Sequence, residues 1–211
     1  MRVIDLSHPM ATGLPVFPGD PEVRLEPASA VPPWRVTRVT LGSHSGTHID
    51  APSHFFADGR SITDYPAERF ILPAVLVQLP DLADDAAIPL HLLRESLPGS
   101  PIGQAVLLAT GWDRYWGTDR YSRHPYLSEE AAVWLAEARP GLVGVDALNV
   151  DSTVQGTEHA HLHLLGADVL IVENLRGLRN VPPDRDYLFV CLPLPLQGAD
   201  GAPVRAVLLE R

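Results

Sequence analysis

The chain has 211 residues, of which 45% are hydrophobic and 20% are charged, so it can bury the core of one α/β or all-β domain. Its formal net charge of -10 is the opposite of the basic balance that binds nucleic acid or an anionic membrane surface. We therefore expect a small molecule or a protein surface as the partner, with neither nucleic acid nor membrane involved.

Segments that would direct the chain to a membrane or an oxidising compartment are not apparent. The start, "MRVIDLSHPM", lacks the apolar centre of a signal peptide, and no run approaches the roughly 20 apolar residues of a membrane helix. Cys191, the single cysteine, lies in the apolar run "YLFVCLPLP", which indicates a buried strand and excludes an internal disulfide or a cysteine-rich zinc site. These features predict a cytoplasmic protein.

Strands are expected where β-branched and apolar residues lie between turn residues, and helices where charged caps and helix-forming residues occur. In the first half of the chain we predict strands at 2–7, 22–26, 34–43, 74–79 and 104–110, and helices at 61–71 and 89–97. The strand-rich beginning indicates that the sheet is not purely parallel.

The second half alternates helices and apolar strands. Ser128 can cap a helix over 128–138, because Glu129 and Glu130 place negative charge on its first turn and Pro140-Gly141 ends it. After it we predict a strand at 142–148, a helical stretch at 158–166, and strands at 168–175, 187–194 and 204–210. The pattern predicts an α/β fold with a mixed β-sheet in one compact domain, 1–211.

The segment "HSGTHIDAPSHF", residues 44–55, brings together imidazole and carboxylate groups that suit Zn²⁺ or Mn²⁺. On a helix Asp50 would point about 200° away from His48, and an extended strand would spread His44, His48 and Asp50 over roughly 20 Å. A strand that ends and folds back can gather all three, because Gly46 tolerates a positive φ and Pro52 forces a further turn. The motif is therefore expected to be a loop built around an ion.

His54 follows Pro52 and is close enough in sequence to face the same site, which makes it a candidate general base. For His8, His91 and His124 we expect ordinary hydrogen-bonding roles. Glu173 lies near the end of an apolar strand, where an unpaired carboxylate would be costly, so it needs a cationic partner. That partner is a metal ion or, alternatively, an arginine such as Arg176 or Arg179.

The motif resembles the His-x-Gly-Thr-His-x-Asp-x-Pro-x-His-Phe signature of the cyclase-like metal-dependent hydrolases, a family that includes the bacterial kynurenine formamidases (arylformamidases). "IDLSHPM", "PVFPGD", "TGW" and the ending "LPLPLQGADGAPVRAVLLE" match as well, so the resemblance spans nearly the whole chain. It implies a compact α/β architecture of the swivelling β/β/α kind and association at least as a homodimer.

The resemblance also implies two divalent metal ions per chain, Zn²⁺ with Mn²⁺ as the alternative. His44, His48 and Asp50 would hold the first ion, and Asp50 would bridge to a second ion held by His161 and Glu173. His54 matches the family's catalytic histidine. Within "HAHLH" the neighbouring His159 and His163 leave the register open on sequence grounds, and His163 is expected to be structural.

The chemistry implied by the resemblance is hydrolysis of N-formyl-L-kynurenine to L-kynurenine and formate in tryptophan catabolism, by a metal-bound hydroxide with His54 as acid and base. Six aromatic residues could wall the pocket of such an aromatic substrate: Phe17, Trp34, Phe55, Phe56, Tyr65 and Trp112. Phe17 stands where kynurenine formamidases commonly carry tryptophan. The alternatives are hydrolysis of isatin, another cyclic amide or a lactone, with a single Mn²⁺ in the isatin type, and a non-catalytic metal-binding protein.

Overall fold

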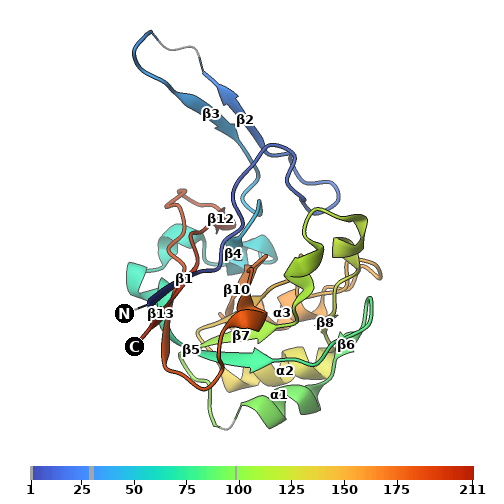
Figure 1. The fold of residues 1–211 in the computed structure, drawn as a ribbon. Helices are drawn as coiled ribbons and strands as arrows, with labels where there is room; N and C mark the ends of the chain where they lie inside the picture. The colour runs from blue at the N-terminus through green and yellow to red at the C-terminus, as the bar shows by residue number, and fades with distance from the viewer. Residues whose placement is uncertain (1, 29–30, 98) are drawn as a thin grey trace.

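A nine-stranded mixed sheet runs through the computed structural model, which describes residues 2–28, 31–97 and 99–211 (Figure 1). Its strand order is β1-β13-β11-β5-β7-β9-β10-β4-β12. The four central strands are parallel, namely β5 (Ile71–Gln78), β7 (Ala105–Ala109), β9 (Leu142–Val145) and β10 (Leu170–Glu173). The flanking strands are antiparallel, namely β1 (Arg2–Asp5), β4 (His48–Asp50), β11 (Tyr187–Val190), β12 (Gly201–Pro203) and β13 (Val207–Glu210). The predicted α/β fold with a mixed sheet is confirmed.

The parallel strands are apolar at successive positions because both faces of the sheet are covered. In β7, Val106 and Leu108 belong to one buried cluster, and Leu107 and Ala109 belong to the other. The first cluster includes side chains of three helices, α1 (Leu90–Ser96), α2 (Glu129–Ala138) and α3 (His159–Gly166). The second cluster is built with β1, β11 and β13. This packing holds α3 against the sheet beside β10.

Most predicted elements are present with shorter bounds. Ser128 accepts a hydrogen bond from the Ala131 amide, so the predicted cap of α2 is confirmed. The helix predicted at 61–71 is wrong, since this segment forms two short 3-10 helices, Ile62–Asp64 and Ala67–Phe70. Pro66 separates them because it holds the preceding residue in an extended conformation. Two short strands, β6 (Ala87–Ile88) and β8 (Tyr126–Leu127), were not predicted from the sequence.

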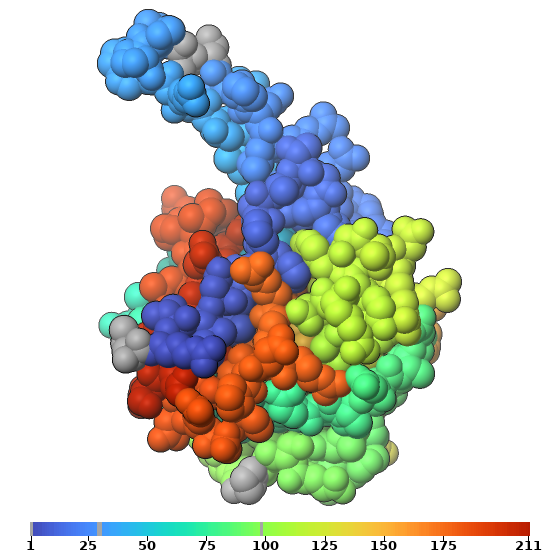
Figure 2. Space-filling view, in the orientation of Figure 1, coloured from blue at the N-terminus to red at the C-terminus, as the bar shows by residue number. Residues whose placement is uncertain are grey.

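The strands β2 (Arg24–Pro27) and β3 (Thr37–Thr40) form an antiparallel hairpin separate from the large sheet. It projects from the body of the molecule as an arm (Figures 1 and 2). Among the helices of the described residues, none is long and apolar enough to cross a bilayer. Cys191 is buried directly after β11, as expected from its apolar surroundings.

Candidate metal centre

The centre of the histidine motif is strand β4, which lies between β10 and β12 in the sheet. Because side chains alternate along a strand, His48 and Asp50 share one face while Ile49 is buried in the core. Gly46 has a φ of +65° and turns the chain so that His44 Nδ1 lies 2.6 Å from Asp50 Oδ1. The expected fold-back at Gly46 is confirmed, but the expectation that the whole motif is a loop was wrong.

Two distant segments bring further ligand-type side chains to Asp50. The antiparallel register pairs Glu173 of β10 with His48, which places Glu173 Oε2 3.5 Å from His48 Nε2. His161 enters from α3, with its Nε2 3.7 Å from Asp50 Oδ2 and 3.7 Å from Glu173 Oε1. The structure thus brings together all five side chains that the resemblance assigns to metal binding.

These side chains form two groups that share Asp50. One group is His44, His48 and Asp50, the other is Asp50, His161 and Glu173, and the ligand atoms within each lie within 4.8 Å of one another. Asp50 Oδ2 is buried and has no hydrogen-bond partner. A buried carboxylate oxygen without a partner raises the free energy of the folded protein, and a cation bound at this position would supply the missing partner. The donor set therefore fits a divalent ion.

The ring nitrogens of two histidines are held by groups outside the site. His48 Nδ1 donates to the Gly46 carbonyl at 2.9 Å, and His161 Nδ1 lies 2.9 Å from Asp151 Oδ2. Both contacts leave Nε2 facing the carboxylates of the site, as an imidazole ligand requires. Asp151 also accepts hydrogen bonds from the backbone amides of Ala160 and His161. Asp151 belongs to no recognisable motif, so it could not be identified from the sequence.

The site concentrates negative charge in a buried place. Burial, reinforced by Asp50, raises the pKa of Glu173 to about 7. Burial by itself would lower the pKa values of His44 and His161, but neighbouring carboxylates outweigh it and raise them to about 9 and about 10. Protons therefore neutralise the carboxylates in the metal-free protein, and a divalent ion would displace those protons.

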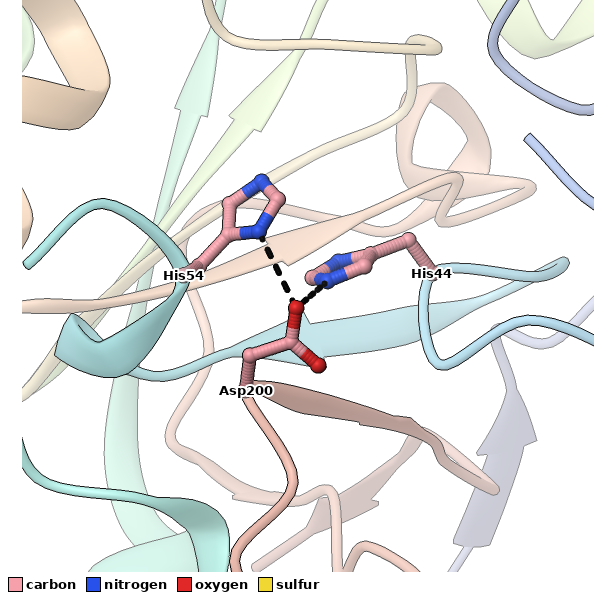
Figure 3. A group of neighbouring side chains, drawn as sticks. All are labelled: His44, His54 and Asp200. Atoms are coloured by element: carbon pink, nitrogen blue, oxygen red, sulfur yellow. Dashed lines mark hydrogen bonds and ion pairs between the residues drawn. The ribbon is translucent and has the colours of Figure 1, made fainter. Parts of the chain in front are cut away.

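His54 ends a short 3-10 helix, Pro52–His54, that follows β4. The centroid of its ring lies 4.0 Å from that of His44 and 5.7 Å from that of His161, and its side chain is 30% exposed. Burial lowers the pKa of His54, so the imidazole is neutral at pH 7 and can accept a proton. Its Nδ1 lies 3.4 Å from Asp200 Oδ2, and Asp200 also contacts His44 (Figure 3). Asp200 was not identified from the sequence.

The site opens into a cavity of about 300 Å³. Its lining includes all six predicted site residues together with Phe17, Phe55 and the carboxylates Asp20 and Glu158. Phe55 stacks on His161 with a centroid distance of 4.8 Å. Four of the six expected aromatic wall residues are not in the lining: Trp112 and Tyr65 are core residues, Phe56 packs against the core, and Trp34 is 70% exposed near β3.

The remaining histidines lie outside the cavity lining. His8 stacks on Trp116, and His124 is buried between the Pro125 carbonyl and the Thr153 hydroxyl. His159 contacts the Leu127 carbonyl, and His163 lies near Glu129. Among the three histidines of "HAHLH", the structure therefore places only His161 in the site.

Arg176 and Arg179, the two arginines considered as partners of Glu173, pair with other carboxylates. Arg176 pairs with Asp5, and Arg179 pairs with Asp81. Glu173 instead accepts a hydrogen bond from the Val150 amide and faces His48 and His161. The cationic partner expected from its burial is therefore not an arginine.

The fold and the site together define an α/β protein with a buried histidine and carboxylate centre of the metal-binding type. The family model described as "Putative cyclase" matches residues 4–152, and the chain belongs to this cyclase family. That match includes the motif at 44–55 and ends before His161 and Glu173.

Curated relatives match over nearly the whole chain. The kynurenine formamidase of Bordetella petrii is 34% identical, with 99% of this chain and 98% of the relative covered. The kynurenine formamidase of Salinibacter ruber is 35% identical, with 100% and 98% covered. The family expected from the sequence is therefore confirmed.

Solved structures match the fold closely. Isatin hydrolase A from Labrenzia aggregata, bound to benzyl benzoate, superposes with a TM-score of 0.87 at 25% identity, covering 98% of this chain and 93% of that one. A protein described as a potential metal-dependent hydrolase with cyclase activity superposes with a TM-score of 0.83 at 30% identity, covering 100% and 98%.

Proposed function

We propose that residues 1–211 act as one metal-dependent hydrolase domain that converts N-formyl-L-kynurenine to L-kynurenine and formate in tryptophan catabolism. The observation that carries this proposal is the position of Asp50, whose two oxygens face two groups of ligand-type side chains at the base of a cavity lined by His54. The full-length similarity to two kynurenine formamidases supports the choice of substrate.

Two divalent ions, Zn²⁺ or Mn²⁺, would be held by the five ligand-type residues, with Asp50 shared between them. When bound, such ions polarise a carbonyl group and lower the pKa of water towards 7. The site residues supply the rest of what an amide hydrolase needs. The buried carboxylates offset part of the positive charge of the ions, and the imidazoles are held in one orientation.

His54 is proposed as the acid and base of the reaction. Its imidazole is neutral at pH 7 and reaches the cavity, so it can take a proton from the attacking water and deliver it to the leaving nitrogen. Hydrolysis of a formamide requires both transfers, since the C–N bond breaks as the amine gains a proton. An aryl amine is a good leaving group for this step.

The lining favours an aromatic substrate with a positive group. Phe17 and Phe55 can contact an aryl ring, and Asp20 and Glu158 can pair with the α-ammonium group of N-formyl-L-kynurenine. Isatin has no ammonium group to use these carboxylates. Hydrolysis of isatin is nevertheless the second candidate, because an isatin hydrolase shares the fold with a TM-score of 0.87.

The test is a hydrolysis assay of N-formyl-L-kynurenine, isatin and a simple lactone in parallel, with Zn²⁺, with Mn²⁺ and after chelation. We expect metal-dependent turnover that is fastest with the formamide. The His54→Ala variant should keep its metal and lose about 10²- to 10⁴-fold in kcat, whereas His163→Ala, outside the cavity, should be unaffected. Faster turnover of isatin would favour the second candidate.

We also propose that the chain forms a homodimer. The hairpin of β2 and β3 projects from the body, and a two-stranded hairpin alone is at best marginally stable in water (Figure 2). Apolar side chains are exposed on and beside β3: Val31, Trp34, Val36 and Val39. Sedimentation equilibrium should show a dimer, and Trp34→Ser should weaken it; a monomeric wild-type protein would refute the proposal.

A further inference from the structure

We infer that Asp200 is a positioning residue, whose carboxylate holds the imidazoles of His44 and His54 in the tautomers that metal binding and proton transfer require. This inference rests on the proposed function, since it assigns His44 to a metal ion and His54 to the reacting atoms. Asp200 itself contacts neither the metal ion nor the reacting atoms, and it acts through the two imidazole rings.

One carboxylate oxygen makes both contacts. Asp200 Oδ2 lies 3.1 Å from His44 Nε2 and 3.4 Å from His54 Nδ1, and the two rings approach it from different segments (Figure 3). An ionised carboxylate can only accept hydrogen bonds, so both of these nitrogens must carry hydrogen. When the two imidazoles are neutral, as metal binding and proton transfer require, their lone pairs then fall on His44 Nδ1 and on His54 Nε2.

The tautomer set at His44 is the one that its geometry demands. His44 faces Asp50 through Nδ1, at 2.6 Å, whereas His48 and His161 face the carboxylates through Nε2. Each of those two is held at its other nitrogen, by the Gly46 carbonyl and by Asp151. Asp200 supports His44 in the same way, but it contacts Nε2, whereas the other two histidines are held at Nδ1. It thereby gives the third imidazole the same kind of support.

For His54 the contact with Asp200 orients the free nitrogen. Among the described residues, Asp200 is the only one whose side chain lies within hydrogen-bond distance of a ring nitrogen of His54. A neutral imidazole without such a contact exchanges between two tautomers, of which one presents N–H where the reaction needs a lone pair. Holding Nδ1–H towards Asp200 keeps Nε2 available as the base.

The backbone fixes Asp200 relative to the motif. The Ala51 amide donates to the Asp200 carbonyl at 2.8 Å, and the next residue, Gly201, pairs with Asp50 in the ladder between β12 and β4. The side chain of Asp200 is 42% exposed, so replacing it should not unfold the protein. The residue combines a fixed main chain with a side chain that has little part in the core.

A third cation held by His44, His54 and Asp200 is the competing interpretation, since these three also lie within 4.8 Å of one another. In that arrangement His44 would bind metal through both nitrogens and would have to lose its second ring proton, which a neutral imidazole does not readily do. His54 would become a ligand and could no longer serve as the base. Positioning by Asp200 requires neither change.

The experiment compares wild type, Asp200→Asn, Asp200→Ala and the control Asp58→Asn, an exposed aspartate in the loop after the motif. Zinc content is measured after dialysis, ring tautomers by long-range ¹⁵N–¹H correlation of the zinc-loaded protein, and kcat and KM with N-formyl-L-kynurenine. The His54→Ala variant assigns the His54 signals and is included in the zinc measurement.

We expect His54 to carry hydrogen on Nδ1 in wild type and Asp58→Asn, and to become a tautomeric mixture in Asp200→Ala. Both Asp200 variants should lose about 10- to 100-fold in kcat with little change in KM, and the loss should be smaller for Asp200→Asn than for Asp200→Ala. Both should also bind zinc more weakly than wild type. The His54→Ala variant should retain all its zinc. Unchanged tautomers and kcat in Asp200→Ala would overturn the inference. So would a third zinc equivalent that Asp200→Asn and His54→Ala both lose. If wild type hydrolyses no formamide, the proposed function fails, while the tautomer and zinc measurements still decide the role of Asp200.

Discussion

Replacing Gly201 by alanine is expected to displace His44 from the first ligand group. A Cβ at Gly201 would lie 2.6 Å from His44 Cε1 and 2.9 Å from the carbonyl oxygen of Ile49. The carbonyl belongs to β4 within the ladder to β12, so it cannot retreat without disturbing the strand pairing. The imidazole must move by about 0.8 Å to restore an ordinary contact of 3.4 Å, and the ladder between β12 and β4 must also widen at Ile49.

Such a movement separates His44 Nδ1 from Asp50, whereas His161 of α3 and Glu173 of β10 are not among the three atoms nearest to the added Cβ. Titration of the metal-free Gly201→Ala protein with Zn²⁺ should show one ion bound about 10- to 100-fold more weakly and the other nearly unchanged. A displacement of this size should also reduce kcat/KM about 100-fold.

Gly166→Ala is the matched control. Gly166 ends α3, and a Cβ there would meet Phe56 Cζ at an ordinary 3.4 Å. This variant should bind zinc and turn over substrate as wild type does. If Gly201→Ala binds both ions with wild-type affinity and keeps kcat/KM within about twofold, the assignment of His44 to a metal ion is refuted.

Three further predictions address the shared carboxylate, the cavity lining and a buried histidine. Asp50→Asn should lose most bound zinc and activity while it stays folded, as measured by metal analysis and circular dichroism; retention of two zinc equivalents would contradict the bridging role. Glu158→Gln should raise KM for N-formyl-L-kynurenine several-fold but not for formanilide, which lacks the ammonium group; an equal rise for both would exclude ion pairing. Burial lowers the pKa of His124 to about 4, so only the unfolded chain binds this proton between pH 6.5 and 4, and stability falls as pH falls through that range. Urea unfolding should therefore show wild type losing about 1.5 kcal/mol more than His124→Gln between pH 6.5 and 5, and equal losses would show that His124 is not buried as neutral imidazole.

Local signals in the sequence account for much of the fold. The cap at Ser128, the apolar run of β7 and the glycine at position 46 act over a few residues, so each could be interpreted without knowing the rest of the chain. The helix expected over 61–71 fails for a local reason as well, because Pro66 breaks it into two turns.

Long-range pairing explains what the sequence could not show. The strands β4 and β12 have three residues each and exist because they pair with each other and β4 pairs with β10. The register between β4 and β10 places Glu173 beside His48, and the register between β4 and β12 puts Asp200 at the end of β4. Both acidic residues are more than 100 positions from β4 in the sequence.

The choice among the histidines of "HAHLH" has the same origin. On α3, His161 points about 200° away from His159 and His163, which are four positions apart and share a face of the helix. Only the packing of α3 against β10 decides which of them faces Asp50, and spacing in the sequence contains no information on that packing. The family resemblance selected His161, and the structure places His161 3.7 Å from Asp50.

The central claim is that two groups of side chains sharing Asp50 hold divalent ions in the cavity. Anomalous diffraction at the zinc absorption edge, from crystals of the zinc-loaded protein, tests it most directly. Two peaks are predicted, one bonded to His44, His48 and Asp50 and the other to Asp50, His161 and Glu173. An empty cavity, or a peak bonded to His44, His54 and Asp200 instead, would contradict it.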